Sequence, residues 1–338
     1  MNTGKHSRKK SRGTSAPLVI AVIFVCACAL VLVLTLNGTL QPIVAQLTGQ
    51  DSQESSDQQT QQSQEESPVE PKQFSYYTWD ELSRISSEIA AAPDDDSGRQ
   101  LAEYYNLVDE NGVPTGSTRE VVLSDNTLAY ARIVGIRHDQ RSDGQGVAGI
   151  TLMLSMVSEQ PMNQENSSDG GWESSWLRSW LSSDGMSLLP EDLQSVIVAV
   201  DKATNNVGET SDVASVTTTS DTLWLFSAKE VCGRISWFSD EFGTEISGTA
   251  DYDEVLNAEG SQYEYFSANG VTQDSSGTGV LALTYRGSAR TWWYRSAYPL
   301  NYMELNPNGY FYRASETGYP SSVGTASETS GVVVGFCL

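Results

Sequence analysis

Apolar and polar positions divide the chain into three regions. Residues 16–36 are almost continuously apolar, residues 49–73 offer almost nothing that a core could bury, and the remainder mixes both kinds at helical and strand spacings. A bilayer span needs ~20 apolar residues, and polar low-complexity sequence stays disordered. The pattern therefore predicts a basic tail at 1–15, a transmembrane signal anchor at 16–36, a disordered tether at 37–73 and a globular domain at 74–338.

Two helix starts in the globular region carry a capping-box pattern. Thr78 and Glu81 precede an apolar stripe in residues 78–92, and Ser227 and Glu230 precede a shorter one. In such a box each side chain accepts a hydrogen bond from the other residue's backbone amide. Both starts therefore predict helices.

Several short runs rich in β-branched and aromatic residues predict strands. They mix with the helices without strict alternation, so we expect an α+β fold with a largely antiparallel sheet and flanking helices. The closing residues 331–338 are apolar and uncharged. We expect them to form an interior strand paired on both edges, with Phe336 in the core. The other strand-like runs are residues 120–124, 127–139, 148–156, 222–226 and 291–297.

Tryptophans recur at positions that suit a core. Trp172, Trp176 and Trp180 recur every four residues, which places them on one helical face; core packing is our prediction, and stacking on sugar rings is the alternative. Trp292 and Trp293 are adjacent in a strand and point to opposite faces. Arg295 follows in the same strand, and a buried guanidinium needs carboxylate or carbonyl partners.

Tyrosines gather after this strand. A tyrosine ring provides contact area and a hydroxyl at a low cost in entropy. We therefore predict a recognition surface formed by Tyr298, Tyr302, Tyr310 and Tyr312.

The charge pattern suggests an orientation and excludes one class of partner. The chain has a net charge of −23, yet its first 36 residues hold five basic residues and no acidic one. The positive-inside rule places this tail in the cytoplasm and the domain outside the cell, at a cell membrane crossed once. A body this acidic repels phosphate backbones, so we expect no nucleic-acid partner.

Catalytic and cofactor signals are weak. His138 is the single histidine after the apolar segment, too few for a histidine-rich metal site. No nucleotide-binding fingerprint occurs, and we expect no cofactor and no metal. A pair of carboxylates acting as a hydrolase stays open, because such pairing is spatial. Cys232 and Cys337 form either a disulfide or two buried thiols.

Five segments occur in an order that resembles a large bacterial family of uncharacterised extracellular domains. That family typically reads W-W-L-R-S-P and ends G-V-R-P-A-F; here Tyr294 and Ala297 replace its Leu and Pro, and Val334 stands near its Arg or Pro. The likeness covers about residues 129–338. The segments are GGWESSWLRSWL, LPEDLQSVIVAVDKATNN, SDTLWLFSAKEVCG, TWWYRSAYP and GVVVGFCL.

The closing segments also resemble, more distantly, the formylglycine-generating branch of the C-type lectin-like fold. This likeness implies a lectin-like sheet. The oxidase chemistry of that branch needs two reactive cysteines near the C-terminus, and Cys337 stands there alone. We therefore expect a membrane-anchored binding or adhesion module of a bacterial cell surface, with a glycan or an envelope protein as ligand. A carboxylate-based envelope hydrolase and a structural or sensory ectodomain are the alternatives.

Overall fold

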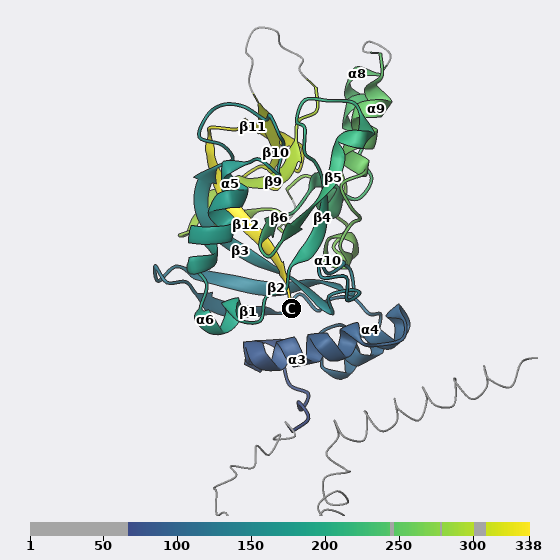
Figure 1. Cartoon of the computed structure of the whole chain (residues 1–338), viewed down its shortest axis with the longest axis vertical. Coiled ribbons are helices and arrows are strands. Elements are labelled where there is room, and N and C mark those ends of the chain that lie inside the picture. The colour runs from purple at the N-terminus through teal and green to yellow at the C-terminus, as the bar shows by residue number, and fades with distance from the viewer. Residues whose placement is uncertain (1–66, 244–246, 278, 301–308) are drawn as a thin grey trace, which may run out of the picture. The chain divides into compact units, whose positions relative to one another are not determined.

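The computed structural model describes residues 67–243, 247–277, 279–300 and 309–338 (Figure 1). These residues belong to one compact unit, Ser67–Leu338. Val69 is buried in it, so the unit begins before residue 74. The predicted anchor at 16–36 lies outside the described residues. In the part of the chain that is described, no helix combines the length and the apolar character needed to cross a bilayer.

The main sheet has eight strands within the described ranges. Seven of them follow the order β1-β2-β3-β12-β9-β10-β11, and β6 pairs with β12 beside this path. All neighbours are antiparallel except β12 and β9. The predicted α+β class with a mostly antiparallel sheet is confirmed. The strands are β1 (Thr118–Val122), β2 (Leu128–Ile136), β3 (Ile150–Pro161), β6 (Trp224–Leu225), β9 (Trp292–Ala297), β10 (Tyr310–Ala314), β11 (Ser322–Thr325) and β12 (Thr329–Cys337).

The last strand of the chain lies inside the sheet, as predicted. β12 pairs with β3 along most of its length, with Phe336 opposite Leu152, and it meets β9 on its other side. Val332, Val334 and Phe336 enter one hydrophobic core, whereas Val333 enters the core on the opposite face. β12, which follows the other seven strands of the sheet in the chain, therefore joins both cores.

Helices cover both faces of the sheet. In Figure 1, α3 and α4 lie beside each other beneath β1 and β2, and the marked C-terminus lies close to them. The first core contains side chains of α3 (Trp79–Ala90), α4 (Asp95–Tyr104), α5 (Trp176–Trp180), the π-helical turn η2 (Leu181–Gly185) and α6 (Glu191–Gln194). The second core contains side chains of α7 (Ala228–Cys232), α8 (Trp237–Phe242), α9 (Thr249–Asn257) and α10 (Glu264–Ala268).

Two small hairpins and two single turns complete the described elements. The hairpins are β4 (Val200–Asn205) with β5 (Val216–Asp221), and β7 (Leu283–Tyr285) with β8 (Ser288–Arg290); the turns are η1 (Phe74–Tyr76) and η3 (Val213–Ser215).

Both predicted capping boxes are confirmed. The Thr78 hydroxyl accepts from the Glu81 amide at 3.1 Å, and the Glu81 carboxylate accepts from the Thr78 amide at 2.8 Å. The Ser227–Glu230 box has both distances at 3.0 Å. These starts were predictable because every partner lies within four residues.

The tryptophan predictions hold with one correction. Trp292 and Trp293 are both fully buried, one in each core. Trp176 and Trp180 are only partly buried; their rings stack 6.4 Å apart and pack against the first core from outside. The fully buried tryptophan of that segment is Trp172, which precedes the helix.

Candidate functional site

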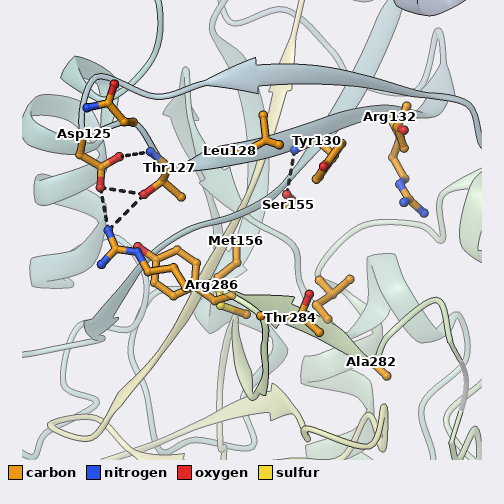
Figure 2. Close-up of a pocket in the computed structure, with 15 residues that line it drawn as sticks. Asp125, Thr127, Leu128, Tyr130, Arg132, Ser155, Met156, Ala282, Thr284 and Arg286 are labelled. Carbon is orange, nitrogen blue, oxygen red and sulfur yellow. Dashed lines mark hydrogen bonds and ion pairs between the residues drawn. The ribbon is translucent and has the colours of Figure 1, made fainter.

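An open groove lies between the outer part of the sheet and the β7–β8 hairpin. Its volume is about 700 Å³, and β1, β2, β3 and the hairpin supply its lining. Figure 2 shows the labelled side chains of β2 and β3 facing Thr284 and Arg286 of the hairpin. The groove combines aromatic, basic, acidic and hydroxyl groups.

Alternation along β2 creates one wall of the groove. Ala129 and Ala131 point into the first core, so Tyr130 and Arg132 point to the opposite face. Tyr130 is 38% exposed, and its backbone amide donates to the Ser155 hydroxyl of β3 at 2.9 Å. The tyrosine ring is thus available to a ligand while its backbone is held in the sheet.

An ion pair connects the hairpin to the β1–β2 turn. Arg286 adopts a φ of 48° in the turn of the hairpin. Its Nη2 lies 3.0 Å from Oδ2 of Asp125 and 3.1 Å from Oγ1 of Thr127 (Figure 2). Hydrogen bonds from the Thr127 amide and hydroxyl, with the nearby guanidinium, hold the pKa of Asp125 below its usual value. The contact fixes one end of the groove.

Aromatic rings support both guanidinium groups of the groove. The Arg286 guanidinium lies 5.0 Å from the ring centre of Tyr285, and that of Arg132 lies 5.2 Å from the ring centre of Tyr265. Arg132 also donates to the Tyr265 hydroxyl. The donors are therefore held in place before a ligand arrives, which reduces the entropy lost on binding.

The predicted tyrosine surface lies at another place, next to α8. Tyr298 contacts both Tyr310 and Tyr312, at ring-centre distances of 6.4 and 5.4 Å. Tyr302 lies outside the described residues. Tyr312 is only 2% exposed, which corrects the expectation of an exposed side chain: it is an inner wall of a pocket that Tyr298 also lines. The three described tyrosines therefore lie close together, and Tyr312 is less exposed than predicted.

A buried network of charges occupies the interior. Arg295 bonds both oxygens of Glu230, and Lys202 lies 2.5 Å from Glu230 and 2.7 Å from Asp139. Asp139 also accepts hydrogen bonds from the hydroxyls of Thr151 and Tyr263. All these side chains are buried. Arg295 thus has both kinds of partner expected for it, the carboxylate of Glu230 and the backbone carbonyl of Leu225.

The network sets unusual protonation states. Burial alone would raise the pKa of Asp139, but the ammonium of Lys202 outweighs it and lowers the value to about 2. Glu259 is different, because burial dominates and raises its pKa to about 7 in spite of Arg295. Its carboxyl group accepts from the amide of Asn205 and from the hydroxyl of Ser296. These groups act on one another and lie away from solvent, which is typical of a structural network.

The two cysteines after the apolar segment are free, buried thiols. Of the two predicted alternatives, the structure therefore has the thiols and not the disulfide. Cys232 belongs to the second core and Cys337 to the first. Cys337 lies 3.2 Å from the Thr151 hydroxyl. The sequence could not decide between the two states because it does not show which core each thiol enters. Within the described ranges, no group of three or more His, Cys, Asp or Glu side chains is placed to hold a metal ion.

The described residues thus form an α+β domain, and its mixed sheet carries an open groove of about 700 Å³ at one end. The chain belongs to the family of DUF6273, a domain of unknown function, which matches residues 138–338. The resemblance to a family of uncharacterised domains is thereby confirmed. No curated protein is significantly similar to the chain. No solved structure matches it either.

Sequence reasoning missed the groove residues Tyr130, Arg132 and Arg286. The signal for the first two was present: alanines alternate with large side chains along residues 128–132, which indicates a strand with one small, buried face. Arg286 had no such signal, because its ion pair spans 161 residues of sequence.

Proposed function

We propose that the chain is a membrane-anchored extracellular module that binds a carbohydrate in the groove between β2 and the β7–β8 hairpin. The observation that supports this is the composition of the groove. An accessible tyrosine ring, Tyr130, lies among hydroxyls and two supported guanidinium groups. Sugar rings present C–H faces that pack on aromatic rings, and hydroxyls that need both donors and acceptors. The groove offers each of these.

The predicted orientation and fold relationship are parts of this proposal. Residues 16–36 serve as the anchor and place the domain outside the cell, as the basic tail indicates. The C-type lectin-like relationship rests on the likeness of the closing segments. A role in adhesion follows if the carbohydrate belongs to a neighbouring surface.

Binding without catalysis fits the groove better than hydrolysis. A glycosidase places two carboxyl groups on either side of the scissile bond. Among the described residues that line the groove, Asp125 is the single carboxylate, and Arg286 and Thr127 already hold it. Glu230 and Glu259 are buried and occupied by their own partners. Glu230 and Glu259 are therefore not accessible to a ligand bound in the groove.

A glycan array probed with the purified full chain tests the proposal. We expect binding to a subset of glycans and a loss of about tenfold in affinity for Tyr130→Ala, since a central tyrosine contributes more than ~1 kcal/mol to an interface. Tyr319→Ala is the matched control, because Tyr319 is similarly exposed but lines the pocket at α8. An array without a bound glycan, or equal binding by the Tyr130→Ala variant, would contradict the proposal.

A further inference from the structure

A second pocket, of about 390 Å³, lies between α8 and β10 on the side of the second core. Aromatic rings form its walls. The rings of Trp237 and Tyr312 are 4.7 Å apart and tilted by 33°, and those of Tyr298 and Tyr312 are 5.4 Å apart and tilted by 48°. Tyr319, which is 46% exposed, adds a further ring at the opening. These rings thus form an aromatic lining on one side of the pocket.

The opening of this pocket is acidic. Asp240, Glu241 and Asp274 line it and are all exposed, and no Lys, Arg or His stands among its described lining residues. None of the cation–π contacts formed within the described residues uses the rings of Trp237, Tyr312 or Tyr319. The pocket therefore has a negative potential that the protein does not itself neutralise with a lining cation.

A hydrogen-bond network holds the entrance in place. The Gln273 amide donates to Asp240 at 3.0 Å and to the Ser236 hydroxyl at 2.7 Å. The Trp237 indole N–H donates to the Gln273 carbonyl at 3.3 Å. One residue thus orients both a ring and a carboxylate of the pocket.

The side chain of Tyr312 is almost completely buried. The side chain lines the pocket. Burial raises the pKa of Tyr312 far above its usual value, and nearby acidic groups, Glu241 among them, add to the rise. The phenol therefore stays neutral.

We propose that this pocket binds an organic ammonium group, with its charge on the aromatic faces and toward the acidic rim. Cations bind aromatic faces within about 6 Å of the ring centre, and quaternary ammonium ligands are held by cages of such rings. A metal ion fits less well, because no described set of three His, Cys, Asp or Glu side chains converges closely enough to ligate one. This site is separate from the carbohydrate groove, so neither proposal depends on the other.

Isothermal titration calorimetry of the full chain with choline tests the site. The control ligand is 3,3-dimethylbutan-1-ol, which has the same shape as choline but no charge. We expect choline to bind at least tenfold more tightly than the neutral alcohol. Equal affinity for the two ligands, or no binding of choline, would overturn the proposal.

Variants locate the binding. Tyr319→Ala and Asp274→Asn should each weaken choline binding about fivefold, the size expected for one cation–π or rim-charge contact. Tyr130→Ala in the carbohydrate groove and Glu316→Gln, an exposed carboxylate outside the pocket lining, should leave it unchanged. If the two control variants weaken binding as much as the pocket variants, choline binds elsewhere and the assignment is wrong.

Discussion

Arg295 and Glu230 are joined by two parallel hydrogen bonds inside the protein, with Nη1 2.5 Å from Oε2 and Nη2 3.0 Å from Oε1. The pair connects β9 of the sheet to α7. Arg295 also donates to the backbone carbonyl of Leu225 at 2.8 Å and to the Thr204 hydroxyl at 2.6 Å. One guanidinium thus joins the sheet, a helix and the β4–β5 hairpin.

Glu230→Gln should destabilise the domain by about 3–5 kcal/mol, because it leaves Arg295 and Lys202 buried with less compensating charge. Chemical denaturation of the full chain measures the change. The control is Glu328→Gln, which removes a half-exposed carboxylate that pairs with Arg313 at 2.9 Å. Such a surface pair contributes about 0–1 kcal/mol. Similar losses of unfolding free energy in the two variants would contradict the prediction, because the buried pair would then contribute no more than the surface pair.

Stability should fall as pH rises from about 4.5 to 7, because of Glu259. Its carboxyl has an ordinary pKa of 4.5 when unfolded and about 7 when folded, so folding favours the protonated form. Above the folded pKa a buried charge remains, at a cost on the order of 3 kcal/mol. Urea unfolding at pH 5 and pH 8 should show this loss in the natural protein and a smaller one in Glu259→Gln. Identical pH dependence in the two proteins would refute the assignment.

Gly335→Ala should destabilise the domain by about 1–3 kcal/mol. A methyl group at this position would stand 2.6 Å from the Trp224 indole, which packs directly on the backbone of β12. Gly279→Ala is the matched control, since a methyl group there meets no atom within 4 Å. Thermal unfolding of both variants checks the prediction, which fails if the two melt at the same temperature.

Removal of residues 332–338 should abolish cooperative unfolding. The deleted strand is paired with β3 and contributes to both cores, and the carbonyl of Leu338 accepts from the Ser86 hydroxyl of α3. Circular dichroism during heating compares the truncated and complete chains. A truncated chain that melts cooperatively within a few degrees of the complete one would show that β12 is dispensable.

Cys232 and Cys337 should resist iodoacetamide in the folded protein and react once it unfolds. Burial raises the pKa of both thiols well above the usual value, so neither provides a reactive thiolate. Peptide mass spectrometry after alkylation before and after denaturation reads each site separately. Recovery of a peptide that links the two cysteines would contradict the structure.

The elements that sequence predicted well depend on neighbouring residues. Both capping boxes and the continuous apolar run of β12 involve residues a few positions apart, so the pattern alone identifies them. The need of Arg295 for carboxylate or carbonyl partners was predictable from its place in a buried strand. The identity of Glu230 was not, because the two are 65 residues apart.

The same limit explains the candidate sites. Tyr298 and Tyr312 lie together because β9 and β10 are paired, yet their exposure depends on α8, which packs beside them from far away in sequence. Tyr130 and Arg286 meet in one groove only because the β7–β8 hairpin returns to β2 and β3. The local pattern of apolar and polar residues predicts which face of a strand or helix a side chain lies on. A pocket, in contrast, is formed by segments that are distant in sequence, and the local pattern does not predict how they pack together.

The central position of β12 has a consequence for how the protein acquires its structure during synthesis. Its neighbours β3 and β9 have no common partner between them until β12, which follows all the other strands of this sheet in the chain, has been synthesised. Pairings between such distant segments are formed late and slowly, because a long loop must close first. The nascent chain therefore carries two incomplete half-sheets with open edges, which invite pairing with other chains. A chaperone that shields those edges should matter more for this protein than for one whose last strand lies at the rim.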